Sequence, residues 1–123
     1  MKRILFVDDD SYVLSGIKRH VRKMQDEWHV SFAANAIQAL EIITAKPVDV
    51  IVTDVRMPGM NGIELIHKIQ ETHPATIPIA VSGHCSTSDA VSLLRTGIRF
   101  FSKPCDIEKL ILLIRHVLRL QSS

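Results

Sequence analysis

The chain has 123 residues and a net charge of +2. This length suits one domain with a substantial core, and so small a charge gives no reason to expect a nucleic-acid or membrane partner. No run approaches the roughly 20 apolar residues of a membrane-spanning helix, and acids at positions 8–10 interrupt the apolar segment that a signal peptide needs. We therefore expect a single cytoplasmic domain over residues 1–123.

Short apolar runs bounded by turn residues predict five strands, since runs of this length are typical of buried strands. They cover residues 3–7, 28–34, 48–53, 76–81 and 98–102. The second run is less apolar than the others, so we expect it at a sheet edge. Pro78 weakens the prediction of the fourth strand, because proline cannot donate to a ladder.

Helix-capping residues occur between the strands. Asn35 precedes Gln38 by three positions and Asn61 precedes Glu64 in the same way, which is the spacing of a capping box. Each pair predicts the start of a helix. A shorter helix is expected to begin at residue 87 or 88, and Gly97 supplies a left-handed stop after it.

The first helix, which begins at Ser11, has two distinct faces. Its apolar face is formed by Leu14, Ile17, Val21 and Met24. Its basic cluster consists of Lys18, Arg19, Arg22 and Lys23. Such a cluster is either an ordinary solvated face or a docking surface for an acidic partner.

The last helix, from about residue 106 to 120, has an unusually wide apolar face. One stripe is expected to pack on the sheet: Ile107, Leu110, Ile111, Ile114 and Leu118. Further apolar residues extend it sideways: Leu113, Val117 and Leu120. Either a neighbouring helix buries them, or they belong to a partner or dimer surface formed by the fourth helix, the fifth strand and the last helix.

Strict alternation of strands and helices predicts an α/β fold with a five-stranded parallel sheet, doubly wound so that helices cover both faces. This is a (βα)5 three-layer sandwich. We adopt the flavodoxin-like strand order 2-1-3-4-5 because it is one of the common doubly wound orders, not because the pattern requires it. In this order the first and third strands are neighbours.

The most distinctive stretch surrounds Asp54, a lone carboxylate at the end of the third apolar run, before a loop with Pro58, Gly59 and Gly62. Ligands of open α/β sheets bind at the carboxyl ends of the strands. In the adopted order, that edge collects polar residues from four strands: Asp8, Asp9, Asp54, Ser82 and Lys103.

This set of residues suits phosphoryl transfer. Crowded carboxylates repel and favour a bound cation, and Mg²⁺ prefers carboxylate oxygens together with phosphate. Aspartate is an established nucleophile toward phosphoryl groups. Lys103 would supply a positive charge for a phosphoryl oxygen, and Ser82 a hydroxyl donor. Positioning and charge neutralisation are the main requirements of the reaction.

Motifs at these strand ends carry a family resemblance. They are Val7-Asp8-Asp9-Asp10, Asp54 with Met57-Pro58-Gly59 and Asn61-Gly62, Ser82, and Phe101-Ser102-Lys103-Pro104. With them, the chain resembles the receiver domain of two-component response regulators along essentially its whole length. The resemblance implies that a histidine kinase or a histidine phosphotransfer protein phosphorylates Asp54. It also implies a Mg²⁺ site made by Asp8, Asp9, Asp54 and the backbone carbonyl of Arg56.

The resemblance also implies a switch rather than an enzyme with multiple turnover. Lys103 would pair with the phosphoryl group, Ser82 would shift toward it, and Phe100 would turn inward, unless Phe100 is an ordinary core or edge aromatic. Arg56 and His84 occupy positions that tune the lifetime of the phosphoryl group. The motifs around Ser82 and Lys103 are similar to those of receivers that precede HD-type output domains, so an output domain beyond this chain is a further expectation.

Two other functions remain open. Asp8-Asp9-Asp10 contains the Asp-x-Asp of haloacid dehalogenase-type phosphatases, with Asp8 as nucleophile, although Ser11 and Tyr12 replace the small residues expected after it. The chain could also be a receiver that binds partners without phosphorylation. Cys85 and Cys105 are either two reduced thiols or, less simply, a redox pair, since each follows a strand and the two strands are neighbours in the adopted order.

Overall fold

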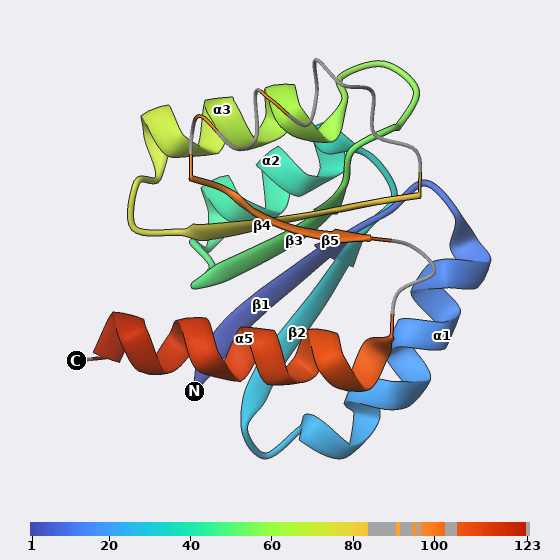
Figure 1. Cartoon of the computed structure of the whole chain (residues 1–123), viewed down its shortest axis with the longest axis vertical. Coiled ribbons are helices and arrows are strands. Elements are labelled where there is room, and N and C mark those ends of the chain that lie inside the picture. The colour runs from blue at the N-terminus through green and yellow to red at the C-terminus, as the bar shows by residue number, and fades with distance from the viewer. Residues whose placement is uncertain (84–90, 92–94, 96, 103–105, 123) are drawn as a thin grey trace.

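A computed structural model describes residues 1–83, 91, 95, 97–102 and 106–122. Its core is a five-stranded sheet in the order β2-β1-β3-β4-β5 (Figure 1). The strands are β1 (Lys2–Val7), β2 (Trp28–Ala33), β3 (Val50–Asp54), β4 (Ile77–Ser82) and β5 (Arg99–Ser102). All neighbouring pairs are parallel. The predicted fold class and strand order are confirmed, and β2 lies at an edge as expected.

Helices cover both faces of the sheet (Figure 1). They are α1 (Ser11–Val21), continued by a 3₁₀ turn η1 (Arg22–Met24), then α2 (Ala36–Ala45), α3 (Gly62–Thr72) and α5 (Ile107–Ser122). The predicted fourth helix falls mainly outside the described residues, although Val91 and Arg95 are both helical. Gly97 has a φ of 69°, which confirms the predicted left-handed stop.

The alternation of side chains along β1 explains the two layers of helices. Ile4 and Phe6 join an apolar cluster with α1 and α5, whereas Leu5 and Val7 join one with α2 and α3. All four side chains are essentially fully buried. Successive residues of a strand point to opposite faces, so a continuous apolar run is what a strand covered on both sides requires.

Both predicted capping pairs form hydrogen bonds. The Glu64 backbone N–H donates to Asn61 Oδ1 (2.9 Å), and the Asn61 backbone N–H donates to Glu64 Oε1 (3.3 Å), which completes a capping box at α3. At α2 the Gln38 backbone N–H donates to Asn35 Oδ1 (2.8 Å). The Gln38 side chain, however, accepts from the Ala34 backbone N–H (2.9 Å), so the reciprocal bond reaches one residue further than predicted.

The first and last residues of the third and fourth strands differ from those predicted. β3 begins at Val50, two positions later than expected, and includes Asp54 as its last residue. β4 begins at Ile77 and includes Ser82. Pro78 is tolerated in this central strand because the Ile77 N–H donates toward β3, to the Asp49 carbonyl (2.9 Å). Position 78 therefore faces β5, whose pairing with β4 starts only at Ile79.

Most of the wide apolar face of α5 is buried. Val117, for which the sequence allowed either burial or a partner surface, is fully buried, and Leu113 packs against the α1–α5 cluster. Leu120 is 53% exposed. The neighbouring elements therefore bury most of this face, and for Val117 the structure decides between the two alternatives in favour of burial.

Part of the basic cluster of α1 contacts other residues of the chain. The Lys18 ammonium lies 5.0 Å from the centroid of the Phe32 ring on β2. Lys23 forms an exposed ion pair with Glu108 of α5 (3.4 Å). Two of the four basic side chains therefore have partners within the chain. Among the described residues, none of the helices combines the length and the apolar content needed to cross a membrane.

Candidate functional site

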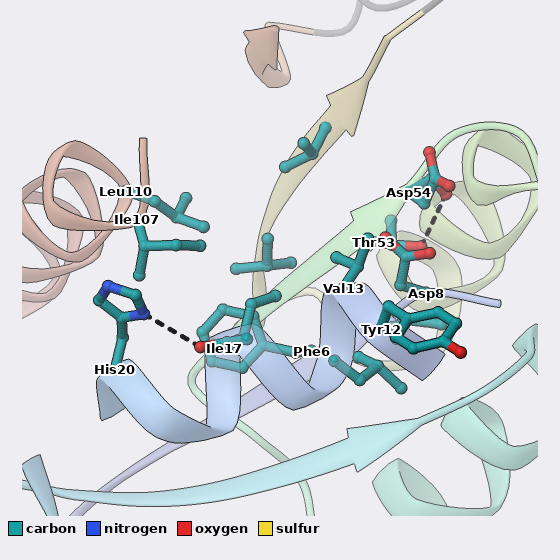
Figure 2. A pocket seen from close by; sticks show the side chains of 15 residues that line it. Phe6, Asp8, Tyr12, Val13, Ile17, His20, Thr53, Asp54, Ile107 and Leu110 are labelled. Carbon is teal, nitrogen blue, oxygen red and sulfur yellow. Dashed lines mark hydrogen bonds between the residues drawn. The ribbon is translucent and has the colours of Figure 1, made fainter. Parts of the chain in front are cut away.

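The register of β1 and β3 brings two acids together. Val7 pairs with Thr53, so Asp8 and Asp54 lie one step further along neighbouring strands. Both share the face of Phe6 and Val52, which point toward α1 and α5. Figure 2 shows their carboxylates side by side at one end of a hollow that α1 borders.

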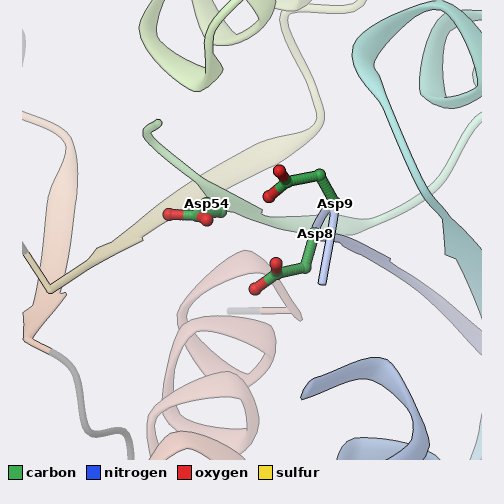
Figure 3. A group of neighbouring side chains, drawn as sticks. All are labelled: Asp8, Asp9 and Asp54. Atoms are coloured by element: carbon green, nitrogen blue, oxygen red, sulfur yellow. The ribbon is translucent and has the colours of Figure 1, made fainter. Parts of the chain in front are cut away.

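Three carboxylates converge at this edge. Oxygen atoms of Asp8, Asp9 and Asp54 all lie within 4.8 Å of one another (Figure 3). Asp8 and Asp54 are only 5% and 9% exposed, whereas Asp9 is exposed. This arrangement suits a hard divalent cation such as Mg²⁺, which takes a few carboxylates and keeps several waters. The buried pair would fix the ion, and the open side at Asp9 leaves room for water or a phosphoryl oxygen.

Local hydrogen bonds give Asp8 and Asp10 different roles. The Asp10 backbone N–H donates to Asp8 Oδ1 (2.9 Å), and the Tyr12 backbone N–H donates to Asp10 Oδ1 (2.9 Å). Asp10 is therefore the N-cap of α1 and is not part of the cluster. Asp8, in contrast, does not cap the helix, and its carboxylate faces the other two acids.

The loop after Asp54 is fixed at its backbone by Gly62. The Gly62 N–H donates to the Val55 carbonyl (2.8 Å), and the Thr53 hydroxyl donates to the Asp54 carbonyl (3.0 Å). A Cβ atom at Gly62 would collide with the Asp54 carbonyl oxygen and lie 2.9 Å from its carbon. The sequence marked Gly62 as a turn residue and as part of a motif. Its role as the contact that lets α3 approach Asp54 depends on tertiary packing.

The other predicted site residues lie at the expected strand ends or outside the described residues. Ser82 ends β4 and is buried, one position beyond Val81, which pairs with Asp54. Phe100 lies on β5 and is 41% exposed. Arg56 is exposed in the loop after Asp54. Outside the described residues lie Lys103, His84, Cys85 and Cys105.

Replacing Asp9 by asparagine is expected to weaken Mg²⁺ binding by about tenfold or more, because one anionic ligand becomes a neutral amide. Calorimetric titration with MgCl₂ measures the change. Asp10→Asn is the matched control, since asparagine caps a helix as well as aspartate and this position lies outside the cluster. Equal Mg²⁺ affinity in the wild type and Asp9→Asn would contradict the assignment of Asp9 as a ligand.

Comparison with known proteins shows which family and which proteins this chain is similar to. A family model described as the response regulator receiver domain matches residues 4–115. The transcriptional regulatory protein YesN of Bacillus subtilis is 31% identical over 118 residues, which are 90% of this chain but 31% of that protein. The chain therefore spans about a third of the length of this curated relative.

Solved structures agree with the fold. The signal receiver domain of an HD domain-containing protein from Pseudomonas fluorescens Pf-5 superimposes with a TM-score of 0.91 at 28% identity, covering 98% of this chain and 97% of that one. The beryllofluoride-activated NtrC4 receiver domain dimer gives a TM-score of 0.86 at 31% identity, covering 98% and 99%. These similarities extend over nearly the full chain.

Proposed function

This chain belongs to the family of response regulator receiver domains of two-component systems, and from that premise we propose that Asp54 is its phosphoacceptor. The donor is a histidine kinase or a histidine phosphotransfer protein, and the reaction requires Mg²⁺. The observation that carries the proposal is the convergence of Asp8, Asp9 and Asp54 within 4.8 Å. Of these three, Asp54 alone ends a strand that is buried along its whole length.

The chemistry is a direct transfer. A carboxylate oxygen of Asp54 attacks the phosphorus, the P–N bond of the phosphohistidine breaks, and the departing imidazole takes a proton from solvent. Asp8, Asp9, Asp54 and the backbone carbonyl of Arg56 would hold Mg²⁺, which when bound neutralises charge on the carboxylates and the phosphoryl oxygens. The Lys103 ammonium is proposed to pair with a phosphoryl oxygen, and the Ser82 hydroxyl to donate to another.

The experiment that tests this function is incubation with acetyl phosphate. We expect a gain of one phosphoryl group per chain, seen by intact-protein mass spectrometry, which chelation of Mg²⁺ prevents. A phosphatase of the haloacid dehalogenase type would instead hydrolyse p-nitrophenyl phosphate over many turnovers and lose that activity in Asp8→Asn. No labelling with Mg²⁺ present would favour a module that binds partners without phosphorylation.

We further propose that phosphorylation changes a surface on the fourth helix, β5 and α5. Phe100 is 41% exposed, and Leu112 and Leu120 of α5 are also exposed. An inward turn of Phe100, coupled to a shift of Ser82, would alter this surface. The NtrC4 receiver domain is a dimer in its beryllofluoride-activated form. Light scattering with beryllofluoride is expected to show a dimer of this chain, and a persistent monomer would contradict the proposal.

The remaining parts of the proposed function concern the natural protein. We propose that residues 1–123 form the receiver domain and that this domain lies in the cytoplasm. We also propose that the natural protein is longer and has an output domain on the C-terminal side of the receiver. The curated relative YesN is about three times longer than its matched part, in line with this organisation. The similarity to a receiver from an HD domain-containing protein makes an HD-type output the first candidate. Contact with nucleic acid is not expected from the receiver itself.

A further inference from the structure

A hollow of about 410 Å³ lies between α1, α5 and the sheet. Figure 2 shows Asp8, Asp54 and Tyr12 at one end and His20 with Ile107 and Leu110 at the other. Its walls are mainly apolar, with Phe6, Ile17 and Leu110 among them. The hollow is open to solvent, since Tyr12 and His20 on its rim are exposed, and small-molecule sites measure about 300–1,000 Å³. Its size and its walls are therefore those of a ligand site.

Gly16 is the second observation that indicates an occupant. It lies inside α1 and lines the hollow. Its φ is not positive, and a Cβ atom there would meet no atom within 4 Å. Glycine is among the least favourable residues inside a helix, and neither the backbone nor any contact within the described chain requires it here. A side chain at this position would, however, take up part of the hollow.

The charged groups that line the hollow indicate which class of ligand would suit it. The carboxylates of Asp8 and Asp54 stand at one end of the hollow, with Asp9 beside them. At the far end, His20 Nδ1 lies 3.0 Å from the Gly16 carbonyl oxygen, which holds the ring against the helix. Tyr12 and His20 are separated by about 12 Å of helix. A slender apolar molecule with a positive charge at one end matches this shape.

We propose that the hollow binds an amphipathic organic cation, with its ammonium or guanidinium group on Asp8 and Asp54 and its apolar body along Gly16 and Ile17. The positive group occupies the region in which Mg²⁺ is expected, so the ligand competes with the metal. Its regulatory consequence, slower phosphorylation of Asp54, rests on the proposed function. The binding itself does not.

Three unbranched eight-carbon probes test the charge requirement: n-octylammonium, n-octanol and n-octanoate, each well below its micellar concentration. Methyl-detected NMR is expected to show contacts from the octyl chain of octylammonium to Ile17 and Leu110. Octylammonium is expected to bind at least about tenfold more tightly than octanol, and octanoate more weakly than either. Equal binding of all three, or contacts elsewhere on the protein, would overturn the proposal.

A pair of variants tests the location. Gly16→Leu fills the hollow and is expected to weaken octylammonium binding at least about tenfold, with unchanged Mg²⁺ affinity. Ser15→Leu adds the same side chain at an exposed neighbouring position and is expected to bind octylammonium as the wild type does. Unchanged binding in Gly16→Leu, with circular dichroism showing a folded protein, would overturn the proposal.

Competition separates this inference from the proposed function. MgCl₂ is expected to displace octylammonium in the NMR titration, whether or not the chain can be phosphorylated. If octylammonium binds and is displaced while acetyl phosphate never labels the protein, the ligand site stands and the phosphoacceptor function fails. If labelling proceeds normally and no probe binds, the phosphoacceptor function stands and the ligand site is refuted.

Discussion

Asp54→Asn is expected to lower the rate of labelling by acetyl phosphate by at least about a hundredfold, because an amide is neutral and a poor nucleophile toward phosphorus. The substitution preserves the shape of the side chain. It also removes one of three negative charges that lie within 4.8 Å of one another. Since like charges repel, the free energy of unfolding without Mg²⁺ is expected to stay the same or rise.

The measurement pairs intact-protein mass spectrometry with urea unfolding. Asp10→Asn serves as the control, because it makes the same chemical change two residues from Asp8 at a helix cap that asparagine also satisfies. This control is expected to label at the wild-type rate. A label that persists in Asp54→Asn, in a folded protein, would show that another residue accepts the phosphoryl group.

Gly62→Ala is expected to lower the free energy of unfolding by about 1–3 kcal/mol, the usual range for overpacking. Its new methyl group would collide with the Asp54 backbone carbonyl, which is backbone and cannot rotate away. Relief requires α3 to move off β3 or the Asp54 peptide to turn. We therefore expect slower labelling of Asp54 as well as lower stability. Urea unfolding and the acetyl phosphate reaction measure the two effects.

Gly16→Ala is the matched control for this substitution. It adds the same methyl group within a helix, but at a position where the new atom meets nothing within 4 Å. Because alanine is the better helix former, the free energy of unfolding is expected to rise by about 0.5–1 kcal/mol. The two alanine variants should thus shift stability in opposite directions. Loss of stability in both would mean that the close approach of α3 to Asp54 is not the cause.

The comparison of the two glycines shows what the local sequence leaves undecided. Gly62 follows the helix cap Asn61 and Gly16 lies in the middle of α1, but their neighbours along the chain do not show which of them contacts another element. Gly62 is required by a backbone atom of another element, whereas Gly16 faces a hollow. The same applies to Val117: its periodicity allowed either burial or a partner surface, and the packing of α5 decided for burial.

Features that depend on neighbours along the chain could be predicted from the sequence. Apolar runs of strand length, capping pairs such as Asn61 with Glu64, and the left-handed stop at Gly97 are local, because backbone geometry and hydrogen bonds within one turn produce them. It also placed Asp8, Asp9, Asp54 and Ser82 at strand ends. The strand order was adopted and not deduced, because local patterns contain no information about which strands pair.

How these residues meet depends on strand pairing and packing between distant segments. The parallel register of β1 and β3 places Asp8 next to Asp54. The Asp10 N–H donates to the Asp8 carboxylate and so holds that side chain beside the other acids, while the Asp10 side chain caps α1. Lys18 likewise packs over the ring of Phe32, and Lys23 forms an ion pair with Glu108, each partner lying on a distant segment of the chain. Contacts of this kind join residues far apart in sequence, so their geometry is fixed by strand pairing and side-chain packing and by no pattern along the chain.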